Sequence, residues 1–316
     1  MVKLDHYKAR CQVNGAALAL QKPAGHMGKV ELLTRANHVL GEAMLWHAAR
    51  KCLMWIDLYE PMLCSLDLEN GKVARQLLDV AAPIGAIVAT THPDLLIMSH
   101  RNGLSIVDLN SLALTPYANP EQNRDGVIYN DMKVDRWGRL WVGTSHDKEV
   151  MPRGALWCLK TPHDYRLADA GFAISNGPAF SPDGNTMYFS DSFNREILAY
   201  DISPGHEHAQ NRRVFARFHE EDGLPDGLTV DASGCVWSAQ WNGACIFKLA
   251  PSGEVLARYD VPAGNVTSLA FHGTTLFITT ARDSLSQDML EKYPLTGSVF
   301  KSDTDSHGLP ETLFPL

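Results

Sequence analysis

The sequence predicts an all-β fold, a six-bladed β-propeller of four-stranded antiparallel blades. A short apolar strand, a turn rich in Asp, Gly, Pro or Asn, and a strand rich in aromatic and β-branched residues recur six times along the 316 residues. The copies stand about 45 residues apart, which is in the range of one propeller blade. A pair of β-sandwiches would not require a constant period.

The clearest copies of the pattern are residues 132–143, 179–190 and 228–239. Their D-x-x-G and P-D-G centres favour tight reversals, because Gly tolerates positive φ and Asp can bond its own backbone. Weaker copies cover residues 43–57, 86–99 and 268–280. A second hairpin-like stretch follows each copy, so each unit is predicted to supply four strands.

The two ends of the chain are predicted to complete one blade together. Residues 30–33 precede the first hairpin and residues 297–301 follow the last, and both stretches have strand-like composition. No low-complexity linker interrupts this region. We therefore expect residues 29–316 to form one catalytic propeller domain, and residues 1–28 to be a poorly ordered N-terminal extension.

Composition and charge indicate a folded protein and argue against several kinds of partner. The chain is 45% hydrophobic and 20% charged, as is usual for folded proteins. A formal net charge of -8 argues against nucleic acid and anionic membranes as partners, and no apolar run approaches the ~20 residues of a membrane span. The six cysteines contain no CxxC pair. We expect a cytoplasmic protein, a monomer or weak homo-oligomer.

Polar residues stand where the innermost strand of each predicted blade begins. That strand lines the central channel, so the residue just before it projects into one mouth of the channel. Four of the six copies carry a carboxylate or a carboxamide there, at the same point of the repeat: Glu42, Asn130, Asn176 and Asp226. Any one of them would also suit an ordinary turn. Together they predict a site for one divalent metal ion, since hard cations prefer oxygen donors.

Five motifs in order resemble one family. They are LGEAMLW at 40–46, YNDMKVD at 129–135, ISNG at 174–177 with YFSDS at 188–192, LPDGL at 224–228, and VTSLAF at 266–271. Over about residues 30–310 the chain is similar to the regucalcin/gluconolactonase/luciferin-regenerating-enzyme-like family. The resemblance implies a six-bladed propeller with Glu42, Asn176 and Asp226 as metal ligands. It gives Asn130 a metal-side or substrate-contacting role, and aldonolactone hydrolysis as the activity.

The expected reaction is metal-dependent opening of a small sugar lactone by Lewis-acid activation and attack of water. Asp226 is the expected general base, with a water activated by the ion itself as the alternative. Ca²⁺ is the expected metal, and Zn²⁺, Mn²⁺, Mg²⁺ and Fe²⁺ are alternatives. Hydrolysis of another small ester or a phosphotriester, and a non-catalytic metal-binding scaffold, remain open. The sequence lacks a GxSxG elbow, an HExxH motif and a Gly-rich phosphate loop.

One position departs from the family pattern. Animal members carry an Arg two residues before the Asn, where this chain has Ile128. We expect Ile128 and Asn130 to line the substrate site, with candidate polar contacts in place of the Arg at Arg101, His146, Gln240 and Arg282. Since an aliphatic side chain offers no hydrogen bond, the preferred lactone should lack a polar group at that wall. We expect a pentonolactone, or a hexonolactone bound in another orientation, to be favoured over glucono-δ-lactone.

Overall fold

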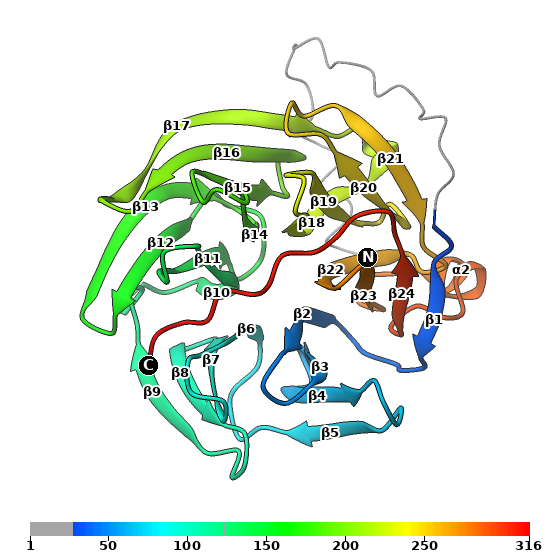
Figure 1. Ribbon diagram of the computed structural model, residues 1–316, viewed down its shortest axis with the longest axis horizontal. Helices are drawn as coiled ribbons and strands as arrows, with labels where there is room; N and C mark the ends of the chain where they lie inside the picture. Colours follow the sequence, from blue (N-terminus) through cyan, green and yellow to red (C-terminus); the bar gives the residue numbers. More distant parts are fainter. Residues whose placement is uncertain (1–27, 123) are drawn as a thin grey trace.

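The computed structural model describes residues 28–122 and 124–316, so the expectation for the N-terminal extension lies almost wholly outside the described residues. The described strands form six antiparallel sheets of four strands each, arranged in a ring (Figure 1). The predicted six-bladed β-propeller is confirmed. In the five blades of consecutive strands the first strand faces the centre of the ring and the fourth lies at the outside; in the sixth, β22 faces the centre and β1 lies at the outside.

Five blades consist of consecutive strands. From the channel outward they are β2 (Gly41–His47), β3 (Cys52–Asp57), β4 (Met62–Asp67) and β5 (Val73–Leu77); β6 (Ile84–Ala89), β7 (Leu95–His100), β8 (Gly103–Asp108) and β9 (Leu114–Ala118); β10 (Val127–Val134), β11 (Leu140–His146), β12 (Gly154–Thr161) and β13 (Asp164–Phe172); β14 (Ser175–Phe180), β15 (Thr186–Asp191), β16 (Glu196–Ser203) and β17 (His206–Arg217); β18 (Leu224–Val230), β19 (Val236–Trp241), β20 (Cys245–Leu249) and β21 (Val255–Asp260).

The sixth blade joins the two ends of the described chain. It consists of β22 (Asn265–His272), β23 (Thr275–Ala281), β24 (Val299–Asp303) and β1 (Glu31–Thr34), with β1 antiparallel to β24. The predicted sharing of one blade is therefore confirmed, and the ring is closed by hydrogen bonds between its ends. Within the described residues, two short helices lie in loops: η1 (Glu220–Asp222) before β18, and α2 (Gln287–Lys292) between β23 and β24.

The D-x-x-G turns stabilise the hairpins in the way that their sequence predicts. Asp135 Oδ1 accepts backbone N–H bonds within its turn, and Asp135 Oδ2 accepts the indole N–H of Trp141 at 2.8 Å. Asp231 does the same for its own turn and for Trp237, at 3.0 Å. Both tryptophans are fully buried. A single carboxylate thus fixes the turn and anchors the large core residue of the next strand.

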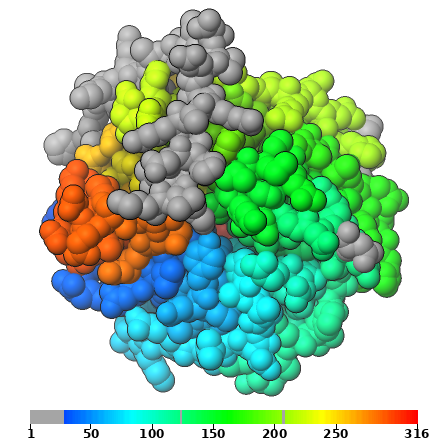
Figure 2. Space-filling model, turned by 180° about the vertical axis from the view of Figure 1, so that it is seen from behind, coloured from blue at the N-terminus to red at the C-terminus, as the bar shows by residue number. Residues whose placement is uncertain are grey.

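The residues after β24 cross the face of the propeller opposite the predicted metal site. In Figure 1 this red segment runs across the ring, and it is largely hidden in the opposite view of Figure 2. Its residues form bridges from Gly308 to Asp231 and from Phe314 to Thr90. Phe314 is fully buried in the core of the neighbouring blades, with its ring edge-on to Tyr117. The C-terminal segment thus closes the far end of the channel.

We expect Phe314→Ala to lower the free energy of unfolding by about 3–5 kcal/mol, because it removes a fully buried aromatic ring and leaves a cavity. Chemical denaturation of the purified protein measures this change. Leu313→Ala is the matched control, since the neighbouring Leu313 side chain is 43% exposed. Equal effects of the two substitutions would contradict the role given to the C-terminal segment.

The cysteines that the structure describes are buried in the blades. They are Cys52, Cys64, Cys158, Cys235 and Cys245; Cys11 lies outside the described residues. Burial raises the pKa of Cys64 and of Cys245 to about 12. These side chains pack as small apolar groups in the blades. Among the described residues, no helix has the length and apolar character needed to cross a lipid bilayer.

Candidate functional site

The innermost strands begin at one mouth of the channel, and the four polar residues singled out in the sequence meet there. Glu42, Asn130, Asn176 and Asp226 all line one cavity of about 390 Å³, which we call the mouth cavity. They come from β2, β10, β14 and β18, in four different blades. Ile128 on β10 also lines this cavity. Residues far apart in the sequence therefore surround one space.

A β-bulge lies at this point in every inner strand. The sequence predicted that the four polar residues stand at the same point of the repeat. Relative to the bulge they occupy two positions that differ by one residue, so this prediction is wrong by one residue. Glu42 and Asn176 stand three positions before the first paired residue beyond the bulge, whereas Asn130 and Asp226 stand two positions before it.

The offset coincides with a difference in backbone conformation. The residues that follow Glu42 and Asn176, Ala43 and Gly177, have left-handed φ values of 52° and 69°. Asn130 and Asp226 are not followed by such a residue. A bulge changes the direction of the side chains beside it. The two pairs of residues differ in backbone conformation and in position relative to the bulge, and the side chains of both pairs line the same cavity.

Hydrogen bonds hold the two carboxamides in place. Asn130 Nδ2 donates to the carbonyl of Ser175 and to Asn176 Oδ1, both at 2.7 Å. Asn176 Nδ2 donates to Ser192 Oγ at 3.0 Å, and the Ser192 hydroxyl donates to the carbonyl of Pro225 at 2.6 Å. Both amino groups are therefore used within the protein. Asn130 Oδ1 remains as an acceptor, whereas Asn176 Oδ1 already accepts one hydrogen bond from Asn130 and has one lone pair left for a ligand.

The two carboxylates of the site are buried close to other acidic groups. Glu42 is 8% exposed and Asp226 is 5% exposed. Burial and the nearby Asp131 carboxylate raise the pKa of Glu42 well above its ordinary value. Burial, Glu42 and Asp131 raise the pKa of Asp226 in the same direction. Among the ion pairs of the described residues, none neutralises Glu42 or Asp226. The site therefore concentrates negative charge in a poorly solvated place.

This donor set fits a hard divalent cation. Two carboxylates and two carboxamides supply oxygen atoms only, which is the chemistry that Ca²⁺ and Mg²⁺ prefer. No group of three or more His, Cys, Asp and Glu residues within residues 28–122 and 124–316 has a metal-binding arrangement. Asn130 and Asn176 are not of these residue types, although their amide oxygens are suitable ligands. A cation here would also offset the mutual repulsion of Glu42 and Asp226.

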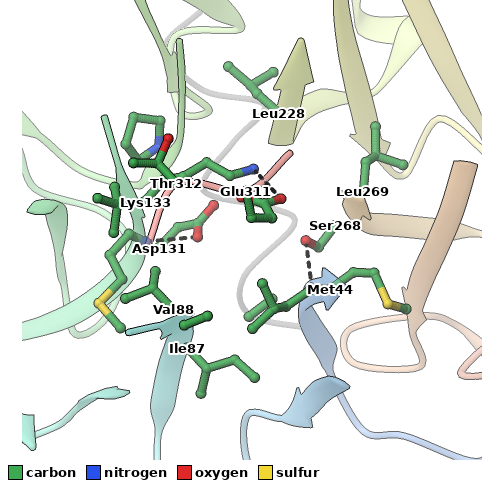
Figure 3. Close-up of a pocket in the computed structure, with 16 residues that line it drawn as sticks. Met44, Ile87, Val88, Asp131, Lys133, Leu228, Ser268, Leu269, Glu311 and Thr312 are labelled. Carbon is green, nitrogen blue, oxygen red and sulfur yellow. Dashed lines mark hydrogen bonds and ion pairs between the residues drawn. The ribbon is translucent and has the colours of Figure 1, made fainter. Parts of the chain in front are cut away.

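Below the four residues, a small inner pocket of about 30 Å³ lies toward the closed end of the channel. Figure 3 shows the Asp131 carboxylate beside this pocket, together with Lys133 and Glu311. Lys133 Nζ lies 3.7 Å from Glu311 Oε1 on the C-terminal segment. Burial raises the pKa of Asp131 to about 6. Asp131 thus faces the inner pocket, whereas its neighbour Asn130 lines the mouth cavity.

The outer part of the mouth cavity contains residues that the sequence analysis missed. Four of them have left-handed backbones although they are not glycine: Glu149, Arg195, Asn242 and Ser284. Each follows the second strand of its blade, which runs back toward the mouth. Unusual backbone conformations of this kind cluster at functional sites. The sequence could have indicated these residues through the direction of the second strand. That strand is antiparallel to the inner strand, so the turn that follows it lies beside the site.

Arg195 supplies the cationic side chain among the described residues that line the mouth cavity. Its Nη1 donates to the carbonyl of Gly223 at 2.7 Å. None of the four residues expected as polar contacts in place of the family's Arg lines this cavity. His146 is buried and its Nδ1 accepts the Val150 N–H, and Arg101 Nε donates to the Ala82 carbonyl. Both side chains are held by nearby backbone and do not line the cavity.

Comparison with known proteins agrees with the fold and with the motifs at this site. Residues 40–282 match the family described as the SMP-30/Gluconolactonase/LRE-like region. The chain belongs to this family. The matched region begins at the residue before β2 and ends just after β23, so it includes all four polar residues of the mouth cavity.

Relatives that are named as lactonases match nearly the whole chain. The sequence is 32% identical over 292 residues to a 6-deoxy-6-sulfogluconolactonase of Pseudomonas putida, covering 90% of this chain and 98% of that protein. It is 32% identical over 291 residues to an L-arabinolactonase of Azospirillum brasilense, covering 91% and 96%. A crystal structure described as a calcium-binding protein, regucalcin, from Agrobacterium tumefaciens strain C58 superposes with a TM-score of 0.85 at 26% identity, covering 95% of this chain and all of that one.

Proposed function

We propose that this family member is a metal-dependent lactonase that hydrolyses a small sugar lactone in the mouth cavity. The observation that carries the proposal is the convergence of Glu42, Asn130, Asn176 and Asp226 on one cavity. The similarity to a 6-deoxy-6-sulfogluconolactonase and an L-arabinolactonase supports the choice of lactones. The calcium-binding description of the regucalcin structure supports Ca²⁺ as the first metal to test. Residues 29–316 would act as a single catalytic domain.

Each residue of the site would have its own role in the reaction. Glu42, Asn176 and Asp226 would hold the cation, and Asn130 would orient the substrate or complete the ligand set. A bound divalent cation supplies Lewis-acid polarisation of an ester carbonyl. Asp226 would also accept the proton of the attacking water, because its carboxylate lies in the same cavity. The buried Ser192 bridge keeps Asn176 aligned while this happens.

A substrate panel tests the reaction class. Chelator-stripped protein, reloaded separately with Ca²⁺, Mg²⁺, Mn²⁺, Zn²⁺ or Fe²⁺, should hydrolyse pentono- and hexonolactones faster than an aryl ester or a phosphotriester. The measurement is kcat/KM for each substrate. Faster hydrolysis of the phosphotriester or the aryl ester would reassign the site to that reaction. Metal binding without hydrolysis of any substrate would instead indicate a non-catalytic metal-binding propeller.

A further inference from the structure

Four aliphatic side chains surround the mouth cavity next to the four polar residues. They are Leu40, Ile128, Ile174 and Leu224, which we call the aliphatic collar, and all four line the cavity. Each stands two positions before one of the polar residues, so the sequence reads L-x-E, I-x-N, I-x-N and L-x-D. Side chains two positions apart on an extended strand share a face, and the pattern therefore stacks one ring on the other.

The collar lies on the outer side of the polar residues. The inner strands begin at the mouth, so residues earlier in each strand are nearer to solvent. Two residues of extended chain rise about 6–7 Å. A small lactone with its carbonyl at the polar residues would thus have the far end of its ring, and the carbon attached there, at the level of the collar.

The apolar wall extends beyond the collar itself. Leu40 and Leu58 are in one buried apolar cluster, and Trp241 packs against that cluster. Leu58, Trp241 and the Met289 side chain on α2 also line the mouth cavity. The other polar side chains that line the cavity lie in the turns after the second strands, among them Glu149, Arg195, Asn242 and Ser284, and at Glu220 in η1. The cavity therefore has an apolar zone between two polar ones.

An aliphatic wall disfavours a substrate hydroxyl at this level. Such a group would leave water and find no donor or acceptor among Leu40, Ile128, Ile174 and Leu224. A methyl group at the same place would instead gain contacts with them. The collar thus distinguishes substrates by the group carried at the end of the molecule distant from the reacting carbonyl.

We propose that the aliphatic collar makes the enzyme selective for 6-deoxyhexonolactones, which end in a methyl group, over the parent hexonolactones, which end in a hydroxymethyl group. This inference rests on the proposed lactonase function and specifies its substrate class. The discrimination should be on the order of 10-fold or more in kcat/KM, since a buried hydroxyl without a partner is strongly disfavoured.

The test uses pairs of lactones that differ by one oxygen atom. The metal-loaded wild-type enzyme is assayed with the 6-deoxyhexonolactone and the parent hexonolactone in gluco, manno and galacto configurations. The 6-deoxy compound should be favoured in the configurations that the enzyme hydrolyses. Ile128→Gln places a donor and an acceptor in the collar, and it should move the ratio toward the parent compound by about 10-fold.

The matched control is Val127→Gln on the same strand. Val127 neighbours Ile128, points to the other face of β10 by strand alternation, and does not line the mouth cavity. It should leave the ratio unchanged, while circular dichroism and thermal unfolding verify that both variants fold. If Ile128→Gln fails to fold, the wild-type ratio alone decides.

Two results would overturn the inference in distinguishable ways. A wild-type preference for the parent compounds, or a ratio near one in every configuration, would reject the collar as a selector while lactone hydrolysis stands. The same change of ratio in Val127→Gln as in Ile128→Gln would also reject it. Failure to hydrolyse any lactone with any metal would overturn the proposed function, and this inference with it.

Discussion

Removal of divalent cations should abolish lactone hydrolysis, and addition of a single type of cation should restore it. Glu42 and Asp226 place two buried carboxylates on one cavity, and none of the ion pairs formed by the described residues neutralises either of them. With Asn130 and Asn176 they present oxygen donors that suit a hard cation. The measurement is kcat on chelator-treated protein, with the metal content determined by elemental analysis, before and after stepwise addition of Ca²⁺.

Restoration should saturate at one equivalent of metal per chain, because the four residues surround a single cavity. Equilibrium binding of Ca²⁺ to Glu42→Gln should be weaker than to the wild type, since that variant removes one of the two carboxylate charges. Glu60→Gln is a suitable charge-matched control because Glu60 is exposed and does not line the mouth cavity. Full activity in protein shown to be metal-free would contradict the proposal outright.

Asp226→Asn should lower kcat by far more than Asp131→Asn. Loss of a general base typically reduces the rate by about 10²–10⁴-fold, and a weakened metal site would add to this effect. The substitution is nearly isosteric, so the backbone of β18 should be retained. Asp131 lines the inner pocket instead of the mouth cavity. Asp131→Asn removes one of the carboxylates that raise the pKa of Asp226, but it leaves the Asp226 carboxylate in the cavity to accept the proton. Steady-state kinetics at saturating metal measure both variants.

Saturating metal separates the two roles proposed for Asp226. If the residue acts only as a ligand, excess metal should restore much of the lost rate in Asp226→Asn. If it accepts the proton, the loss should persist when the site is filled. A kcat close to that of the wild type at saturating metal would show that Asp226 has neither role.

Much of the fold could be predicted because its determinants are local and repeated. Asp135 and Asp231 each fix their own turn and bind a tryptophan six residues later, so the hairpins are encoded within short stretches of sequence. The spacing of these stretches then indicates blades of equal size. Closure of the ring through β1 and β24 followed from strand-like residues at both ends of the repeated region.

The candidate site could be predicted in part for the same reason. Residues near the start of an inner strand lie at the channel mouth, so the repeat pattern indicates Glu42, Asn130, Asn176 and Asp226 to within one residue of register. The outer residues of the cavity could not be selected in this way. Arg195 and Glu149 stand in turns whose composition is ordinary, and their position depends on how the blades pack.

The sequence by itself determined the number of blades, the class of oxygen donors at the mouth, and the pairing of each polar residue with an aliphatic one two positions earlier. These features depend on periodicity, which a linear pattern contains. Three features were decided only by the tertiary structure. Two kinds of bulge bring residues from different register positions together, and Arg101 and His146 are held away from the cavity. The C-terminal segment closes the opposite end of the channel. Each of these features depends on contacts between residues that are distant in the chain. A shift of one residue in a strand, or a single backbone hydrogen bond, is enough to change the direction of a side chain.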